Sequence, residues 1–311
     1  MDERLALVSW NLHGIPFTED PAARFARVAE HVRAIEPAPD LLLFQEVWSG
    51  SLADQLAADL PSYLAAPELE RNWLGSRPAG LMALARREGA WRIEESVLHE
   101  FDTYAPWWRV WEGDALGRKG VQQLRIVGDG GDVMLLHTHL QAMYGKPEYA
   151  PIAAEQLRHL TRVAQGLGNA RPILAAGDLN TRVDSARYAE LRERWIDLTA
   201  EYRERCGCGT SVRDDGEPGA WIDYVLAYDL PRFRVRAKVH LLENRAPDDP
   251  YSDHNGFLVK LRIGRAPSAA WMLGAALALG GGRQPLARRD LLRGAGAALL
   301  GGLTPGLPRP R

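Results

Sequence analysis

Leu41-Leu42-Leu43-Phe44-Gln45-Glu46 is the stretch that decides the fold, because four successive apolar residues end abruptly in a polar pair. A short run that is apolar at every position is typical of a strand covered on both faces. A carboxylate at the mouth of such a strand, here Glu46, is costly to bury unless a partner or a metal ion pairs with it. The stretch therefore predicts a buried sheet with a functional acidic residue at its edge.

Three further strings repeat this arrangement and place acidic, amide or imidazole side chains where a predicted strand meets a loop. They are His137-Thr138-His139-Leu140, Gly177-Asp178-Leu179-Asn180 and Ser252-Asp253-His254. Carboxylate oxygens hold Mg²⁺ or a similar ion, imidazoles move protons near neutral pH, and amides position a phosphate or water without adding charge. Four such strings in one chain indicate a metal-dependent phosphodiesterase site.

Periodicity along the chain predicts many strands and a few helices, which favours one α/β domain over residues 4–263. We expect helices at residues 21–36, 52–60 and 147–167. We expect strands at residues 5–10, 41–44, 80–85, 91–99, 119–127, 132–137, 173–176, 221–227, 233–242 and 256–263.

The composition changes after Gly264, where Ala, Gly, Leu and Pro dominate. Two uncharged stretches, residues 266–282 and 294–308, flank a break that contains four arginines. Both stretches are shorter than a comfortable membrane span and are interrupted by glycine. The tail, residues 264–311, is expected either to be loosely ordered or to touch a membrane. A twin-arginine-like string at residues 288–293 lies at the wrong end of the chain for an export signal.

The overall charge argues against a protein whose affinity comes from coating itself with nucleic acid, because 38 Lys and Arg nearly balance 40 Asp and Glu. This charge balance does not exclude a nuclease with a local basic groove. Cys206 and Cys208 are too few for a disulfide framework or a four-ligand zinc site, so we interpret them as incidental loop residues. Strand-like residues from Leu5 onward leave no room for a leader, so we expect a cytoplasmic or peripherally membrane-associated protein.

The surrounding sequence indicates a function for several polar residues. Asp178 and Asn180 lie two positions apart on a predicted extended backbone, so both polar heads should point into one cleft. Asp223 is a carboxylate inside an apolar strand and needs a partner, for which His139 is the natural choice. His137 ends an apolar run and is interpreted as structural, which leaves His139 as the catalytic candidate.

At these positions the chain resembles the endonuclease/exonuclease/phosphatase superfamily, which includes DNase I, exonuclease III-type repair nucleases, inositol polyphosphate 5-phosphatases and neutral sphingomyelinases. The resemblance spans residues 5–262 and rests on Asn11, Gln45-Glu46, His139, residues 177–180, Ile222-Asp223-Tyr224 and Ser252-Asp253-His254. It implies a four-layered α/β sandwich, in which two facing mixed β-sheets are flanked by helices. It also implies a Mg²⁺ site at one edge, with Mn²⁺ as the alternative ion.

The resemblance further implies a role for each residue. Glu46 would bind the metal, helped by Asn11 and Asp253. Asp178 and Asn180 would orient water and phosphate. His254 would act as general base, and His139, steadied by Asp223, would be a second catalytic imidazole.

Motif details are most similar to the neutral sphingomyelinase branch, in residues 11–16, 46–49 and 138–142 and in Tyr144. Asp114 and Lys119 are spaced as in that branch, which makes Lys119 a phosphate-facing residue; an ordinary hairpin lysine is the alternative. Trp221 stands where repair nucleases usually carry Arg, which weakens the nuclease interpretation. Trp107 and Trp108 either meet a lipid interface or pack in the core.

These details favour a phospholipid head-group diester such as sphingomyelin as the substrate of a metal-dependent phosphoric diester hydrolase. A nucleic acid is the alternative substrate, followed by a phosphoinositide or nucleotide, and an inactive scaffold is the least favoured interpretation. A membrane surface is an expected partner through the tail, and no obligate protein partner is inferred.

Overall fold

Apolar residues at alternate positions produce the strands of this fold. In β1, Leu5 and Leu7 contribute to one buried cluster, while Val8 and Trp10 contribute to another on the opposite face. The strands are β1 (Asp2–Asn11), β2 (Leu41–Gln45), β3 (Tyr63–Ala65), β4 (Met82–Arg86), β5 (Trp91–Glu100), β6 (Gly120–Gly128), β7 (Gly131–His139), β8 (Ile173–Asp178), β9 (Trp195–Asp197), β10 (Asp223–Tyr228), β11 (Phe233–Leu242) and β12 (Gly256–Arg265). The computed structural model describes residues 2–15, 20–67, 78–105, 118–129, 131–213, 217–243 and 251–265.

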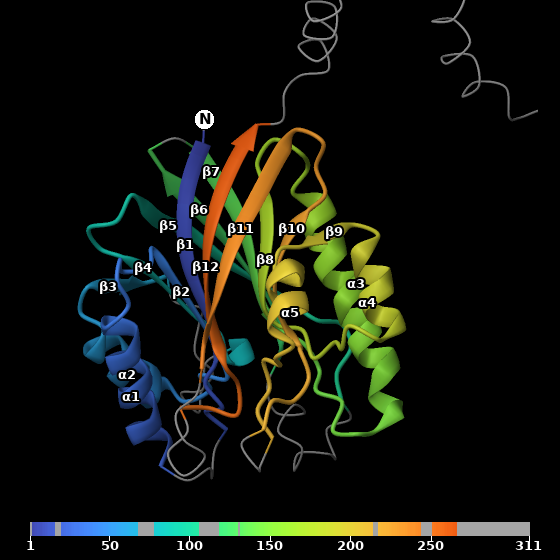
Figure 1. The fold of residues 1–311 in the computed structure, drawn as a ribbon, viewed down its shortest axis with the longest axis horizontal. Coiled ribbons are helices and arrows are strands. Elements are labelled where there is room, and N and C mark those ends of the chain that lie inside the picture. Colours follow the sequence, from blue (N-terminus) through green and yellow to red (C-terminus); the bar gives the residue numbers. More distant parts are fainter. Residues whose placement is uncertain are drawn as a thin grey trace, which may run out of the picture. The chain divides into compact units, whose positions relative to one another are not determined.

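The strands form two six-stranded mixed sheets (Figure 1). The first has the order β11-β12-β1-β2-β4-β3 and the second β5-β6-β7-β8-β10-β9. Within them, β1 pairs in parallel with β2 and β7 in parallel with β8, and the other pairings are antiparallel. Because parallel neighbours end at the same edge of a sheet, each sheet gathers two strand ends at one point.

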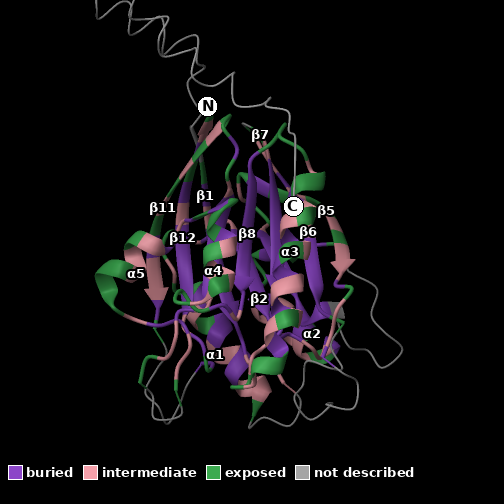
Figure 2. Ribbon diagram, turned by 90° about the vertical axis from the view of Figure 1, so that its right-hand side faces the viewer, coloured by how far each residue is buried: buried purple, intermediate pink, exposed green. Residues whose placement is uncertain are grey.

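The helices are α1 (Pro21–Arg33), α2 (Gly50–Asp59), α3 (Ala150–Gly166), α4 (Ala186–Arg192) and α5 (Ala200–Cys206), with 3-10 turns at Pro78–Gly80 and Pro147–Tyr149. Residues of α1 and α2 pack with the outer face of the first sheet, and residues of α3 and α4 pack with the outer face of the second. In Figure 2, β8 is buried along its whole length. The predicted four-layered α/β sandwich is confirmed.

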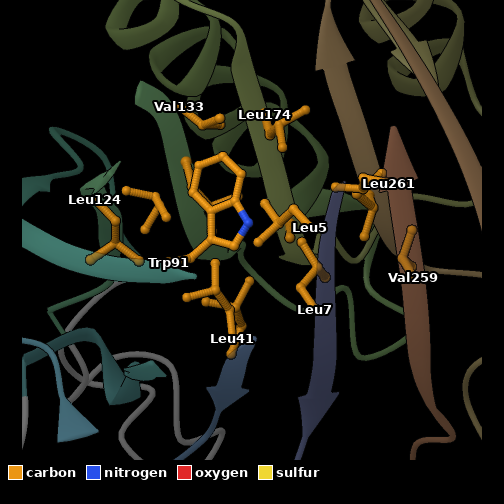
Figure 3. Packing of buried hydrophobic residues seen from close by; sticks show 14 of the residues in the cluster. Leu5, Leu7, Leu41, Trp91, Leu124, Val133, Leu174, Val259 and Leu261 are labelled. Carbon is orange, nitrogen blue, oxygen red and sulfur yellow. The ribbon is translucent and has the colours of Figure 1, made fainter. Parts of the chain in front are cut away.

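The central core lies between the two sheets. Trp91 is buried among residues of both sheets, including Leu5 and Leu41 of the first and Leu124 and Leu174 of the second (Figure 3). Its indole nitrogen donates a hydrogen bond to the Arg4 carbonyl oxygen at 2.7 Å. Burying an aromatic ring in this way stabilises the fold by roughly 2 kcal/mol or more relative to leaving it exposed.

Several details differ from the sequence-based expectations. The predicted helix at 147–167 begins with a 3-10 turn, and α3 starts only at Ala150. The predicted strand at 221–227 begins two residues later, at Asp223. The elements β3, β9, α4 and α5 were not predicted, because three to seven residues are too short to show a periodic pattern. Cys206 and Cys208, interpreted as incidental, form a disulfide at the end of α5.

The described residues belong to one compact unit within residues 1–266. β12 continues to Arg265, two residues beyond the predicted domain boundary. Among the described helices, none combines the length and apolarity needed to cross a membrane. The predictions for Trp107, Trp108, Asp114 and residues 266–311 lie outside the described residues.

Candidate active site

Four strand ends bring the predicted residues together. Asn11 at the end of β1 pairs with Gln45 at the end of β2, so Glu46 follows beside it. In the second sheet, His139 pairs with Asp178 at the ends of β7 and β8. Gly177 makes this pairing feasible, because a side chain there, at φ 137°, would collide with the carbonyl oxygen of Thr138.

Asn11 connects the two sheets at the site. Its amide nitrogen donates to Glu46 Oε1 at 2.9 Å and to Asp178 Oδ2 at 3.1 Å. Its amide oxygen accepts the backbone N–H of His13 at 3.0 Å. In this arrangement Asn11 holds two carboxylates near each other, and its role as a metal ligand stays a prediction.

The surroundings of Glu46 leave part of its negative charge without a partner. The residue is buried at φ 58°, a left-handed conformation that is strained for a glutamate. Oε2 is buried without a hydrogen-bond partner among the described residues. Burial, followed by the nearby charge of Asp253, raises the pKa of Glu46 to about 7. A bound cation would supply the missing partner and stabilise the ionised carboxylate, so the donor set fits a divalent metal.

His254 is paired with Asp223, which corrects the prediction that Asp223 steadies His139. His254 Nδ1 lies 2.8 Å from Asp223 Oδ2, and its Nε2 lies 3.7 Å from Asp178 Oδ2. Burial lowers the pKa of His254, but the charges of Asp223 and Asp178 outweigh it and hold that pKa well above its usual value. Burial, followed by the charge of Asp223, raises the pKa of Asp178 to about 7.

The grouping of Asp178, Asp223 and His254 is compact, since their ligand atoms lie within 4.8 Å of one another. Such a group fits a divalent metal by its donor atoms. In this geometry, however, a protonated His254 already neutralises part of the carboxylate charge. The unbalanced oxygen of Glu46 is therefore the stronger reason to place a cation nearby.

His139 and Lys119 form the side of the site opposite Glu46. Lys119 Nζ donates to the Leu140 carbonyl oxygen at 2.8 Å and lies 3.2 Å from His139 Nε2. Burial, followed by the charge of Lys119, lowers the pKa of His139 well below its usual value. His139 is therefore neutral. Lys119 is only 1% exposed, so the alternative of an ordinary hairpin lysine is wrong.

Asn180 also contacts this donor cluster, but its backbone conformation differs from the predicted one. Its backbone is not extended but left-handed, at φ 45°, and its N–H donates to Asp178 Oδ1 at 2.8 Å. The side-chain nitrogen lies 3.2 Å from His139 Nε2 and 3.1 Å from the Leu140 carbonyl oxygen. Leu179 is buried in the outer core as expected. The turn thus places both polar heads in the site.

Asp253 lies at the rim. Its side chain is 45% exposed, 3.7 Å from His13 Nδ1, and accepts from the Ser252 hydroxyl at 3.3 Å. The charge of Asp253 nevertheless contributes to the raised pKa of Glu46. The predicted role of Asp253 as a helper of the metal ligand fits this position and stays a prediction.

His137 lies between the sheets below the site. Its two ring nitrogens lie 2.8 Å from Gln45 Nε2 and 3.1 Å from Gln122 Oε1. Burial lowers the pKa of His137 to about 3, so the ring is neutral. This neutral bridge agrees with the structural interpretation of His137.

Thr210 is a positioning residue that the sequence did not reveal. Its buried hydroxyl accepts the backbone N–H groups of Ile222 at 2.9 Å and Asp223 at 3.1 Å. Its carbonyl oxygen accepts the N–H of Asn255 at 2.7 Å. Thr210 thus fixes the backbone on both sides of the Asp223–His254 pair. It lies four residues after a helix, in a loop without an apolar pattern, so no local signal marks it.

A family model for the endonuclease/exonuclease/phosphatase family matches residues 8–254, a range that includes every candidate catalytic and metal-binding residue described above. The chain belongs to this family. The predicted class of enzyme, a metal-dependent phosphoric diester hydrolase, is thereby confirmed. A comparison with curated proteins found no match to this chain.

Solved structures of the same fold include proteins with different substrates. D. rerio TDP2 complexed with a single-strand DNA product superposes with a TM-score of 0.63 at 18% identity, covering 84% of this chain and 99% of that one. Sphingomyelinase C from Streptomyces griseocarneus gives a TM-score of 0.59 at 17% identity, covering 83% and 99%. A beta toxin variant from Staphylococcus aureus with bound magnesium ions gives the same values. At these identities the likeness shows the fold, and the substrate is a separate question.

Thr210 gives a first test of the site in this family member. We expect Thr210→Val to lower kcat about 10- to 100-fold, because the loss of the hydroxyl leaves two buried N–H groups unpaired and shifts Asp223. The pH profile should shift as well, since Asp223 holds the proton on His254. The measurement is turnover of bis-p-nitrophenyl phosphate across pH.

Thr210→Ser is the matched control, because it keeps the accepting oxygen and should retain the wild-type rate and pH profile. A folded Thr210→Val variant with wild-type turnover at every pH would contradict the positioning role.

Proposed function

We propose that this chain is a Mg²⁺-dependent phosphodiesterase whose preferred substrate is a phospholipid head-group diester such as sphingomyelin. The observation that carries the phosphodiesterase part is a buried, unbalanced carboxylate facing a buried donor cluster. Glu46 Oε1 lies 3.9 Å from His139 Nε2, and Lys119 and Asn180 both contact that nitrogen. A cation beside Glu46 would meet a negative charge. An anion beside Lys119 and Asn180 would meet a positive charge and a hydrogen-bond donor. A metal-bound phosphate requires both.

Mg²⁺ at Glu46, with Asn11 and Asp253 beside it, would polarise a phosphoryl oxygen and offset the charge that develops on it. Lys119 and Asn180 carry N–H groups that would hold phosphate oxygens after exchanging their present contacts with His139 and the Leu140 carbonyl oxygen. Lys119 is buried and Asn180 is partly buried, which strengthens their electrostatic effect relative to water.

Proton transfer is assigned from the charges around each group. Asp223 and Asp178 favour the protonated form of His254, so we assign His254 as a donor to the phosphate or the leaving oxygen. Asp178, whose pKa is about 7, is the carboxylate that can receive a proton from an attacking water. This assignment differs from the roles predicted from the sequence, in which His254 was the general base and Asp178 oriented the water.

Two exposed apolar residues support the lipid part of the proposal. Tyr144 and Val183 are 43% and 40% exposed, and they lie in the loops that follow β7 and β8. Because these strands are parallel neighbours that end at His139 and Asp178, both loops leave the sheet beside the catalytic residues. An apolar mouth suits a substrate embedded in a lipid surface better than a phosphate backbone in water.

A side-by-side assay on sphingomyelin, a lysophospholipid and plasmid DNA with Mg²⁺ tests this proposal. We expect sphingomyelin to be hydrolysed with the highest kcat/KM, and we expect EDTA to abolish turnover of every substrate. Rapid DNA cleavage that falls steeply with salt, without lipid turnover, would replace the lipid substrate with nucleic acid. The phosphodiesterase assignment would survive that result but not a complete lack of metal-dependent turnover on all three.

A further inference from the structure

The outer face of the first sheet carries a basic patch, which we define as Arg4, Arg234, Arg236, Lys238, Lys260 and Arg262. Alternation in β1, β11 and β12 explains where these side chains point. Their neighbours in sequence, such as Leu5, Val259 and Leu261, belong to the core between the sheets, so the basic residues face outward. Further along the same strands, Val8, Trp10 and Leu258 pack against the helical layer instead.

The register places like charges directly opposite one another. Arg262 is paired with Arg4 on one side and with Arg236 on the other, and Lys260 is paired with Lys238. Like charges at opposed positions destabilise a sheet. Burial lowers the pKa of the neighbouring His240, and the charges of Lys238 and Lys260 lower it further. The chain therefore maintains a repulsive cluster that an external anion would relieve.

Protection of a sheet edge does not account for the whole patch. β11 is an edge strand, and basic residues on an edge prevent it from pairing with other chains. Lys260 and Arg262, however, lie on β12, and Arg4 lies on β1, both of which are interior strands. Their charge needs another explanation.

The patch also surrounds a hollow with a volume of about 470 Å³. Asp40 is the carboxylate that lines it, but that group already accepts the N–H of Ala6 at 2.8 Å and contacts Arg86 at 3.4 Å. Within the described part of the chain, Arg236, Lys238 and Lys260 form no ion pair. The positive charges of these three side chains are thus left for a ligand from outside.

The occupant must be anionic, and the chain's own tail does not qualify. Residues 266–311 contain six arginines and a single acidic residue, Asp290, so they would add to the repulsion. The first of their two uncharged apolar stretches, residues 266–282, follows β12 directly in the sequence. A polybasic surface joined to an apolar segment is the combination that gives stable attachment to anionic membranes, and a nucleic acid has no use for the apolar part.

We propose that the basic patch is a docking surface for an anionic phospholipid membrane. It is separate from the catalytic residues, because Arg4 and Asn11 are seven residues apart on β1, a distance of about 23 Å. The patch attaches the protein to the surface and takes no part in the hydrolysis. The inference therefore stands whether or not sphingomyelin is the substrate.

The test compares the full-length wild type with the double variant Lys238→Gln/Lys260→Gln in sedimentation with vesicles. The vesicles are phosphatidylcholine with and without phosphatidylglycerol. We expect the variant to bind the anionic vesicles on the order of 25-fold more weakly, because each basic side chain at such a surface contributes about fivefold. Its thermal stability should be unchanged or higher, since an opposed like-charge pair is removed. Its turnover of bis-p-nitrophenyl phosphate should equal that of the wild type.

Arg192→Gln/Arg194→Gln is the matched control, because it removes the same charge from two exposed positions at the end of α4. It should bind the anionic vesicles like the wild type. Equal loss of binding in both double variants, or no loss in either, would overturn the proposal. So would a wild type that binds single-stranded DNA but not anionic vesicles, which would make the patch a nucleic-acid surface.

Discussion

Replacing Glu46 with Gln is expected to lower metal-stimulated turnover about 100- to 1000-fold while the fold stays intact, as each 1.4 kcal/mol lost in the transition state costs about tenfold. Gln keeps the volume of the side chain and an oxygen that can accept from Asn11. It removes the charge and places an amide at or beside the position of the unpaired Oε2. The measurement is turnover of bis-p-nitrophenyl phosphate over a series of Mg²⁺ concentrations.

A second measurement separates loss of the metal from loss of structure. Mg²⁺ should raise the melting temperature of the wild type, because a ligand that binds only the folded state stabilises it, and this effect should disappear in Glu46→Gln. Glu193→Gln removes an exposed glutamate after α4 and should behave like the wild type in both assays. If Glu46→Gln retained more than about a tenth of the wild-type rate at saturating Mg²⁺, the assignment of Glu46 as a metal ligand would fail.

The strand ends of the site could be predicted because the signal for each is local. An apolar run followed by a polar residue marks where a strand leaves the core, as in Leu41–Gln45 before Glu46 and Ile173–Asp178 before Asn180. Parallel pairing then brings such ends together at one edge. The first step depends on residues that are neighbours in sequence, and the second on the general geometry of parallel strands, although it joins residues as distant as Asn11 and Gln45.

The pairing of Asp223 could not be predicted in the same way. The sequence shows only that a carboxylate inside an apolar strand needs a partner, and His139 was the histidine chosen. The choice depends on how two sheets are placed against each other. In the structure, Asp223 and Asp178 are opposed on adjacent strands, and His254 reaches Asp223 from the first sheet.

Residues that act through distant contacts were the least visible of all. Thr210 supports Asp223 and Asn255 from a loop whose sequence shows no alternation or helical period. Lys119 was indicated only by the resemblance to the sphingomyelinase branch, and its burial beside His139 has no local signal, because a lysine before a strand is ordinarily exposed. In both cases, elements remote in sequence bury the polar group. A local sequence pattern does not indicate such burial.

Asp178→Asn is expected to lower kcat by about 1000-fold, within the range for a lost acid–base group. Asn retains an oxygen that can accept from Asn11, so the variant should fold, but it cannot take up a proton. Measuring kcat and KM on bis-p-nitrophenyl phosphate should show the loss in kcat. Asp184→Asn changes an exposed aspartate that pairs with Arg182 at the surface; it is the control and should keep the wild-type kcat.

The pH dependence separates the two carboxylates whose pKa is raised to about 7, Glu46 and Asp178. Both must be ionised to act, so the wild-type rate should fall as the pH drops below about 7. Because a cation competes with protons for its ligand, raising Mg²⁺ should move the Glu46 contribution to lower pH. The Asp178 contribution should depend less on Mg²⁺ if that carboxylate accepts a proton rather than binding the ion. If the acidic limb of the pH–rate profile kept moving to lower pH as the Mg²⁺ concentration increased, Asp178 would be a metal ligand. The proton acceptor would then be another group.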